Sequence, residues 1–333
     1  MPEEIEKRAA RAIEEHVFPG CVIGISERGK RVVLAFGTMD GTESTETDTI
    51  YDVASVTKSI PTASLALTFI EKGWLRLSDR VASHLPDLRN HYEATVEDLL
   101  RYRVAGVPLS SLRHLSAQEM EKHILERGFS GPPGVQHYTN LPAYLLGKVL
   151  ESASGELLGN LAAHHFFLPL HMQRTSFGTG LSRGQVAPSE IDARGLSGQA
   201  SEIRGLPHDE SAYVFAKAGI DVGHAGLFST VPDLLTLLEM MLRGLAPYLA
   251  RGAEQGLGWQ VNEAHFMGSF AGSRTFGKTG FTGTSVLSDV GRGVSIVILS
   301  NRTYPKRPPD AAVRGSAIDI FRADIADIVL DGV

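Results

Sequence analysis

Hydrophobic positions near the start of the chain recur first at helical and then at strand spacing. In residues 3–17 an apolar side chain returns every fourth position, which predicts an amphipathic helix. Residues 21–26 and 32–36 are rich in Val, Ile and other strand-favouring types, and a polar turn at 27–30 separates them. This arrangement predicts a β-hairpin. The polar residues 37–49 then predict a long loop.

The middle of the chain, from residue 75 to residue 249, carries mainly helical periodicity. Helices are predicted at residues 96–100, 117–126, 141–152 and 230–243. The last of them begins at Thr230, whose hydroxyl can cap the first turn, and it continues through Pro232, which suits that turn. Residues 169–219 mix turn-forming residues with weak periodicity, so we expect loops with short elements there.

Strand patterns return after Gly256 and are followed by one more helical pattern. Three short apolar runs predict strands at residues 276–280, 283–288 and 294–299. The apolar stripe between Ile318 and Val329 predicts a C-terminal helix.

The order of these elements indicates the fold class. Strands at both ends with helices between them predict an α/β (α+β) fold, in which one antiparallel sheet is built from both chain ends and flanked by helices. We expect a sheet domain of residues 1–74 and 256–333, with a mostly helical domain of residues 75–255 inserted. No internal repeat or low-complexity linker divides the sequence further.

Composition is that of a globular protein with ample apolar material for a core. Of the 333 residues, 43% are hydrophobic and 21% are charged. Lys and Arg number 32 and Asp and Glu 38, so the net charge is −6 and no basic excess points to a nucleic-acid partner. The single cysteine, Cys21, cannot form an internal disulfide, and a small core residue is its expected role.

The sequence also bears on membrane association and location. No apolar run reaches the ~18 residues that a membrane span needs. Residues 2–7 lack the basic and then apolar pattern of a signal peptide. We therefore expect a cytoplasmic protein, or a periplasmic or secreted one if a leader has been removed.

The strongest candidate for chemistry is the start of a predicted buried helix that runs from Tyr51 to about Glu71, with an irregular or kinked first turn at Pro61. Ser55 and Lys58 are three residues apart, so a helix places both side chains on one face. A serine hydroxyl becomes a good nucleophile only when a neighbouring base takes its proton. A lysine can be that base if burial or nearby positive charge lowers its pKa. The alternative is a helix start with one exposed lysine.

Two further motifs lie downstream. Tyr138-Thr139-Asn140 precedes a predicted helix, where a phenol can move protons if a nearby cation favours its phenolate and an amide can orient a carbonyl. Lys278-Thr279-Gly280 lies on the first late strand, where an ammonium and a hydroxyl can bind a carboxylate. A capping Asn with a packed Tyr, and a hairpin Gly with a solvated Lys, are the structural alternatives.

Each motif occurs once, in the order Ser-x-x-Lys, Tyr-x-Asn, Lys-Thr-Gly. With these motifs the chain resembles the serine β-lactamase and penicillin-binding protein superfamily. Further stretches are similar to its class C branch, which includes family VIII-type carboxylesterases: residues 54–58, 131–134, 223–230, 280–284 and 299–302. The resemblance covers about residues 22–302, and it implies an active site in the cleft between a sheet domain and a helical domain.

The resemblance implies a role for each motif residue. Ser55 would be the nucleophile, Lys58 its activating partner and Tyr138 the proton shuttle. The substrate would be bound by Asn140, Lys278, Thr279, Gly280 and Phe281. The backbone N–H groups of Ser55 and Phe281 would form the oxyanion hole. The sequence contains no Glu-x-x-Leu-Asn stretch, so a Tyr–Lys mechanism fits better than a glutamate-activated water.

Three stretches depart from the family pattern or leave their role open. Arg103-Val104-Ala105 replaces the polar part of a stretch that usually reads His-Thr-Ser-Gly. Lys278 stands where many class C-like esterases have His, which keeps β-lactams among the candidate substrates. His208-Asp209-Glu210 could hold a metal, but no second ligand group at metal spacing accompanies it, so a structural or cleft-lining role is expected.

The leading expectation is a serine hydrolase for short acyl esters with weak β-lactam hydrolysis, acting on small molecules without cofactor or metal. One alternative, favoured by Lys278, is a β-lactamase or a D-amino-acid peptidase such as a DD-carboxypeptidase. Another is a penicillin-binding sensor that acylates without turnover. Lys278 would either contact a substrate carboxylate or tune the proton of Tyr138. The sequence leaves open the acyl group, the leaving group and the oligomeric state.

Overall fold

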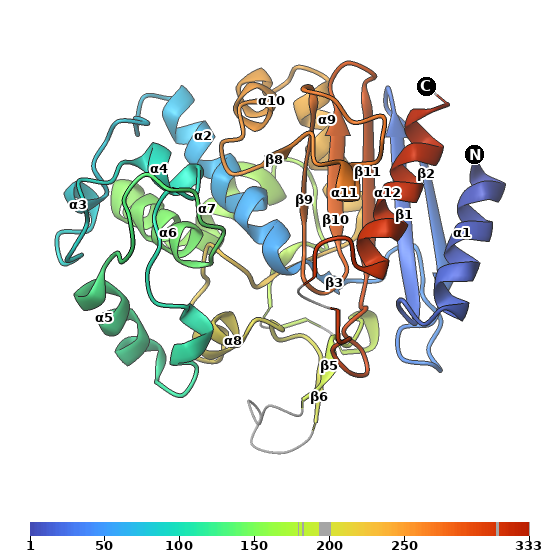
Figure 1. Cartoon of the computed structure of the whole chain (residues 1–333), viewed down its shortest axis with the longest axis horizontal. Helices are drawn as coiled ribbons and strands as arrows, with labels where there is room; N and C mark the ends of the chain where they lie inside the picture. The colour runs from blue at the N-terminus through green and yellow to red at the C-terminus, as the bar shows by residue number, and fades with distance from the viewer. Residues whose placement is uncertain (179, 182, 193–200, 311–312, 333) are drawn as a thin grey trace.

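The largest sheet joins the two ends of the chain, as the sequence predicts (Figure 1). The computed structural model describes residues 1–178, 180–181, 183–192, 201–310 and 313–332. Within them the sheet has the order β2-β1-β11-β10-β9-β8, and every neighbouring pair is antiparallel. Its strands are β1 (Gly20–Glu27), β2 (Lys30–Gly37), β8 (Gln260–Val261), β9 (Thr275–Thr279), β10 (Ser285–Asp289) and β11 (Val294–Ser300). The predicted hairpin, late strands and antiparallel sheet are confirmed.

One face of the sheet is covered by helices from both chain ends. These are α1 (Pro2–Glu14), α11 (Ala264–Met267) and α12 (Ala317–Leu330), and α1 lies beside α12 in Figure 1. Alternate strand residues such as Ile23 and Ile25 point to this side, where they join a core with Phe18 and Phe321. The two rings meet edge to face with centroids 4.9 Å apart. The predicted N- and C-terminal helices therefore hold the sheet from outside.

The opposite face packs against helices from the middle of the chain. Val22, Val297 and Leu299 point to this side and share a core with α9 (Val231–Leu242), α10 (Pro247–Glu254) and α2 (Ser64–Glu71). Gly24 of β1 lies so close to α9 that an added Cβ would collide with Val231. Although α9 falls inside the predicted helical domain, it lies directly on the sheet. The domain boundaries given by the sequence stay a prediction.

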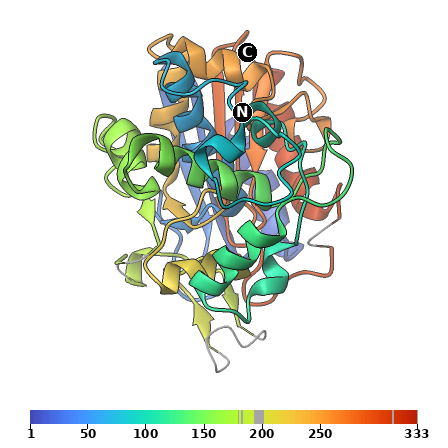
Figure 2. The same cartoon turned by 90° about the vertical axis from the view of Figure 1, so that its left-hand side faces the viewer.

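The remaining helices gather on the far side of α2, in front of the sheet in Figure 2. They are α3 (Val81–His84), α4 (Val96–Leu100), α5 (Ala117–Arg127), α6 (Leu141–Ser154), α7 (Leu158–Ala162) and α8 (Glu210–Lys217), with a 3-10 turn at Leu109–Leu112 and a π-helical turn at Ala163–Phe167. Side chains cap their starts as the sequence directs: Thr95 and Ser116 form capping boxes, and Asp209 caps α8. Thr230 likewise caps α9. The predicted helices in this region are confirmed.

The prediction of one helix from Tyr51 to Glu71 is wrong. The stretch begins with β3 (Tyr51–Asp52), continues as a 3-10 turn (Ala54–Lys58) and a π-helical turn (Ser59–Ala63), and becomes α-helical only at Ser64. Ile60 is extended, with φ −119° and ψ 110°, because a residue before proline avoids the helical region. Pro61 therefore interrupts the helix, whereas the sequence predicted only an irregular or kinked first turn. Ser55 and Lys58 still share one turn.

Residues 169–219 form loops with short elements, as predicted, apart from residues 179, 182 and 193–200, which lie outside the described residues. Their elements are β4 (Ser176–Phe177), a 3-10 turn (Arg183–Gln185), β5 (Glu190–Ile191), β6 (Glu202–Ile203) and α8. β4 pairs with β7 (Leu227–Ser229), which also pairs with β3 beside Ser55. No helix in the described part of the chain is long and apolar enough to cross a membrane.

Candidate active site

Ser55 lies on a turn whose backbone is fixed from several sides. Ala54, directly before it, has a φ of +48°, a conformation that non-glycine residues adopt only when their surroundings impose it. The buried carboxylate of Asp52 accepts the Ala54 N–H at 2.8 Å. Thr57 donates its hydroxyl to the Ala54 carbonyl at 2.7 Å. The turn therefore presents the serine hydroxyl in one orientation.

Lys58 contacts Ser55 directly. Its Nζ lies 2.7 Å from Ser55 Oγ and donates to the carbonyl of His224, also at 2.7 Å. Only 1% of the lysine is exposed. Burial lowers the pKa of Lys58 to about 8, against the opposing charge of Asp209. A substantial neutral fraction is thus present near neutral pH, and a neutral amine at this place can accept the serine proton.

Tyr138 faces both lysines. The Nζ of Lys58 lies 5.7 Å from the ring centroid, and that of Lys278 lies 4.5 Å from it. The ring side is open, since 57% of the residue is exposed. Desolvation at the hydroxyl end raises the pKa of Tyr138 to about 12, the interaction with the Ser55 hydroxyl lowers it, and the charge of Asp209 raises it. Tyr138 is therefore a phenol at neutral pH and has a proton to donate.

Lys278 is enclosed by aromatic rings. Its Nζ lies 4.8 Å from the ring centroid of Tyr102 and 3.4 Å from the Tyr102 hydroxyl, while Tyr138 covers another side. Only 1% of Lys278 is exposed. Burial and, to a smaller extent, the charge of Lys58 lower the pKa of Lys278 well below its usual value. The arrangement favours the tuning role for Lys278 over a direct carboxylate contact.

Tyr102 also belongs to this site, although no sequence motif predicted it. It follows α4 with a φ of +55°, its ring centroid is 5.2 Å from that of Tyr138, and it is almost fully buried. Its carbonyl accepts the His137 N–H at 2.7 Å, so the loop after α4 is fastened to the loop that carries Tyr138. The departure at Arg103-Val104-Ala105 marked this loop as unusual, but only the fold brings it to Lys278.

Asn140 is oriented by a buried polar cluster that the sequence also left unassigned. Its Nδ2 donates to Asp209 Oδ2 at 2.8 Å. The other oxygen of Asp209 lies 3.3 Å from His224 Nε2 and accepts the Ser211 hydroxyl at 2.6 Å. Burial opposes the ionisation of Asp209, but His224, Ser211 and backbone donors outweigh it, so its pKa is well below the usual value. The ionised carboxylate of Asp209 thus lies near Lys58 and fixes the Nδ2 side of the Asn140 amide.

The Gly280-Phe281 turn forms the wall of the site next to Ser55, and two arginines donate hydrogen bonds to its carbonyl groups. Arg322 donates to Gly280 O at 2.9 Å, and Arg302 donates to Phe281 O, also at 2.9 Å. Among the described residues the Phe281 N–H has no hydrogen-bond acceptor. A backbone donor that is fixed and unoccupied suits the oxyanion hole that the sequence predicts. Neither arginine was singled out for this task by its sequence pattern.

Two threonines attach this wall to the turn that carries Ser55. Thr282 donates to Asp52 O at 2.7 Å, and Thr284 donates to Val53 O at 2.9 Å. Gly280 has to be glycine, because an added Cβ would collide with Thr284 Oγ1 and Val53 O. The nucleophile and the proposed oxyanion donor therefore move as one unit.

Two pockets adjoin at these residues. One, of about 250 Å³, is lined by Ser55, Tyr138, Thr279, Gly280 and Phe281 together with Arg302, Arg314 and Arg322. The other, of about 720 Å³, is lined by Tyr102, Arg103, Trp259 and Lys278, among others, and it shares Tyr138 with the first. The predicted site residues are thus gathered in one place, where Lys58 is buried and Asn140 is half-buried.

His208 has a structural position. Its ring stacks on Phe281 at a centroid distance of 5.6 Å, its Nε2 lies 2.7 Å from Glu190 Oε2, and its N–H donates to Asp52. Among the residues with described positions, no group of three or more His, Cys, Asp or Glu side chains is placed to hold a metal ion. Of the three neighbouring residues, His208 supports Phe281, Asp209 orients Asn140, and Glu210 pairs with Arg307.

Comparison with known proteins gives a consistent family. The family model described as "Beta-lactamase" matches residues 5–318. A "Putative D-alanyl-D-alanine carboxypeptidase" of Escherichia coli (strain K12) is 28% identical over 310 residues, which are 78% of this chain and 70% of the relative. A protein of the same description from Salmonella agona (strain SL483) is 28% identical over 326 residues, 81% of this chain and 74% of the relative.

Solved structures share the fold over nearly the whole chain. "EstCE1, a hydrolase with promiscuous acyltransferase activity" has a TM-score of 0.73 at 20% identity and covers 97% of this chain and 98% of its own. A class C beta lactamase from Rhodobacter sphaeroides has a TM-score of 0.72 at 21% identity, with coverages of 95% and 98%. The D-alanine carboxypeptidase AmpC from Burkholderia cenocepacia has a TM-score of 0.70 at 19% identity, with coverages of 96% and 98%.

Proposed function

The chain belongs to the beta-lactamase family and has the fold of its serine hydrolases, and on that premise we propose that it acts through a covalent acyl-enzyme on Ser55. One observation carries the proposal. The buried amine of Lys58 lies 2.7 Å from Ser55 Oγ with a pKa lowered to about 8. That is the geometry that a serine needs to become a nucleophile, and the lowered pKa makes the neutral amine easier to reach.

In the acylation step, Ser55 Oγ attacks the substrate carbonyl carbon while its proton passes to neutral Lys58. The new Oγ–C bond places negative charge on the carbonyl oxygen, which the N–H groups of Ser55 and Phe281 stabilise. The tetrahedral intermediate collapses when the bond to the leaving group breaks. Tyr138, a phenol beside both lysines, donates a proton to that group and recovers one from Lys58.

In the deacylation step, a water molecule replaces the leaving group and the same groups work in reverse order. Tyr138 and Lys58 together take one proton from the water as its oxygen attacks the ester carbonyl. The Oγ–C bond then breaks, Ser55 recovers its proton, and a carboxylic acid leaves. Asn140 orients the acyl carbonyl from the side, since Asp209 fixes its amide.

Short acyl esters are our first choice of substrate. The pocket beside Ser55 has a volume of about 250 Å³, which suits a small acyl group. The ammonium of Lys278 is enclosed between two rings, which favours charge tuning over the contact that would distinguish a lactam carboxylate. We also propose a cytoplasmic location, which cell fractionation would test.

A β-lactamase or D-amino-acid carboxypeptidase is the second candidate. Arg302, Arg314 and Arg322 line the pocket that contains Ser55, and a substrate carboxylate would find cationic partners there. Two relatives carry the description of a putative D-alanyl-D-alanine carboxypeptidase, which supports testing this activity.

A steady-state panel of p-nitrophenyl esters, a chromogenic cephalosporin and D-alanyl peptides separates these candidates. We expect multiple turnover on all active substrates, the highest kcat/KM on acetyl or butyryl esters, and slow hydrolysis of the cephalosporin. A higher kcat/KM on the cephalosporin or the peptides would move the assignment to the second candidate. A single acylation without turnover on every substrate would instead identify a penicillin-binding sensor.

A further inference from the structure

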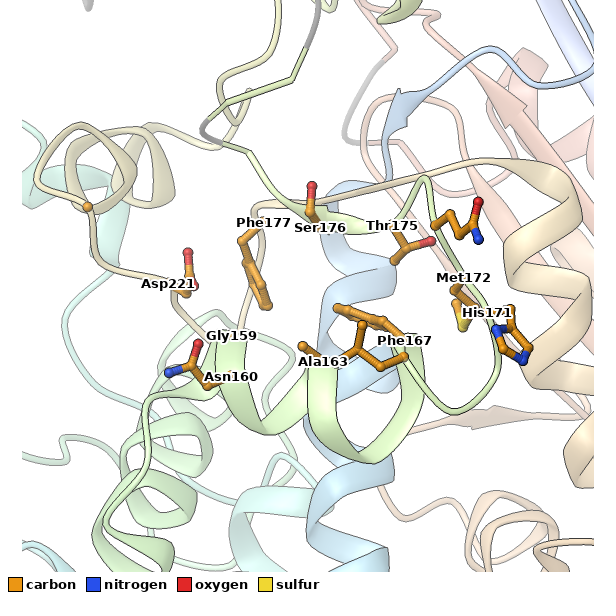
Figure 3. A pocket seen from close by; sticks show the side chains of 13 residues that line it. Gly159, Asn160, Ala163, Phe167, His171, Met172, Thr175, Ser176, Phe177 and Asp221 are labelled. Carbon is orange, nitrogen blue, oxygen red and sulfur yellow. The ribbon is translucent and has the colours of Figure 1, made fainter.

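A third pocket, of about 470 Å³, is shown in Figure 3. Its walls come from α7, the π-helical turn Ala163–Phe167, residues 168–177 and the loop that precedes β7. No residue that lines it also lines the pockets at Ser55. Its volume is within the range of small-molecule sites, and its lining does not take part in the proposed reaction.

The side chains of this pocket combine an apolar surface with one acidic group. Phe167, Met172 and Phe177 lie along its length in Figure 3 and are largely buried. Asp221 lies at one end, next to Gly159 and Phe177. His171 lies at the other end, and it is the second titratable residue among those that line the pocket. An apolar cavity with one well-placed charged group is the usual form of a small-molecule site.

The carboxylate of Asp221 has no protein partner. Across the described residues, neither a hydrogen bond nor an ion pair reaches it. Burial, and to a smaller extent the charge of Glu151, raise the pKa of Asp221 to about 6. Glu151 itself is occupied, because it pairs with Lys148 and accepts the Leu158 N–H. A partly buried carboxylate without a protein partner can pair with a cationic ligand.

Gly159 lets the Asp221 carboxylate lie directly against α7. A Cβ at this residue would collide with Asp221 Oδ2 and would lie 3.7 Å from the Phe177 ring. The carboxylate therefore lies at the end of the pocket where the backbone carries no side chain. A cation on the open side of this carboxylate would form an ion pair with Asp221.

We propose that this pocket binds a small organic ammonium ion with an apolar body. The ammonium group pairs with Asp221, and the apolar body extends along Phe177, Phe167 and Met172. Anionic compounds are repelled by the carboxylate, and neutral compounds of the same shape lack the ion pair. Binding here does not require Ser55 and does not depend on the proposed hydrolase activity.

Benzylammonium and benzyl alcohol test the proposal, because they are similar in shape and differ in charge. Each is titrated into the wild-type protein at pH 7.5 and followed by isothermal calorimetry. We expect saturable binding of benzylammonium, with an affinity ~10-fold or more above that of benzyl alcohol, in line with a charged hydrogen bond. Absence of saturable benzylammonium binding, or equal affinities for the two compounds, would overturn the proposal.

Variants locate the binding. Asp221→Asn keeps the shape and is expected to lower the benzylammonium affinity ~10-fold or more while leaving that of benzyl alcohol unchanged. Gly159→Ala should also weaken benzylammonium binding, because its methyl group displaces the Asp221 carboxylate. Asp87→Asn removes an exposed carboxylate elsewhere and should change neither affinity. Melting temperatures check that each variant is folded; an unchanged benzylammonium affinity in folded Asp221→Asn would contradict the assignment.

Discussion

The wall that carries Ser55 and the rim that carries Tyr138 are held in place by different kinds of contact. We call Ser55, Lys58 and the Gly280-Phe281 turn the nucleophile wall. Hydrogen bonds to backbone carbonyls fix it, and two threonines and two arginines supply them.

The aromatic rim consists of Tyr102, Tyr138 and Lys278. Its members meet through ring contacts 4.5 to 5.2 Å long, and Tyr138 is more than half exposed. Hydrogen bonds fix atoms to within tenths of an ångström, whereas ring contacts tolerate sliding. The wall therefore suits bond making and the rim suits proton transfer and substrate entry. If this division is correct, substitutions in the nucleophile wall should lower kcat on every substrate. Substitutions in the aromatic rim should mainly change how the activity depends on pH.

The largest effects are expected where wall and rim exchange a proton. Lys58→Ala and Tyr138→Phe should each lower kcat/KM by ~10²-fold or more, the usual contribution of a general base or acid. The double variant should lose much less than the product of the two, because residues that act as a unit are not additive. Cleanly multiplicative losses would show that the two residues act independently.

The same pair predicts a pH profile. Lys58 must be neutral to accept a proton, and its pKa is about 8, so kcat/KM of the wild type should rise as the pH increases from 6 to 9. The apparent value belongs to the coupled group of Lys58, Tyr138 and Lys278. A profile that falls over this range would exclude Lys58 as the base.

Arg302 tests whether the wall needs its backbone support. Arg302→Met removes the hydrogen-bond donor to Phe281 O. We expect kcat on a neutral ester to fall ~10-fold or more, because a displaced Phe281 N–H stabilises the oxyanion less well. KM for that ester should hardly change. Arg274→Met, which removes an exposed partner of Glu254, is the matched control. Equal activities of the two variants would mean that the Phe281 N–H is positioned without Arg302.

Lys278 separates the two roles that the sequence left open. The enclosed ammonium predicts that Lys278→Ala lowers kcat/KM by a similar factor, ~10-fold, on a p-nitrophenyl ester and on a cephalosporin, with a displaced pH profile. A loss confined to the cephalosporin would restore the carboxylate contact and shift the preferred substrate towards β-lactams.

The smallest effect is expected at Tyr102, a positioning residue of the rim. Tyr102→Phe keeps the ring over Lys278 and should retain nearly full activity, whereas Tyr102→Leu should lose a few-fold in kcat/KM and displace the pH profile. Two variants with equal losses and unchanged profiles would indicate that the ring supports the loop only.

Much of the fold follows from local sequence, and the exceptions have physical causes. The hairpin, the late strands and the capped helices depend on near neighbours, so their patterns predict them correctly. The single helix through Ser55 fails because Pro61 forces Ile60 out of the helical region. Ser55, Lys58 and Tyr138 were predicted from their motifs, and the fold brings them together. Tyr102 was not predicted, because its partner Lys278 is 176 residues away and only tertiary packing brings them together.

The contacts made by Asp209, Arg302 and Arg322 could not be assigned from the sequence for the same reason. Each of these residues contacts a backbone or side-chain group in a distant segment, and no spacing of residues along the sequence predicts such a contact. The Tyr-x-Asn motif and the stretch at 280–284 nevertheless contain the partners in these contacts, which are Asn140, Phe281 and Gly280. Sequence motifs thus marked the groups expected to react, while the groups that hold them required the fold.

The central claim is that Ser55 becomes acylated, and intact-protein mass spectrometry tests it most directly. Wild-type protein treated with a fluorophosphonate or a fluorescent penicillin should gain the mass of one label, and peptide mapping should place it on Ser55. Ser55→Ala should remain unlabelled under the same conditions. Labelling of Ser55→Ala at the wild-type rate, or a label mapped to another residue, would contradict the account.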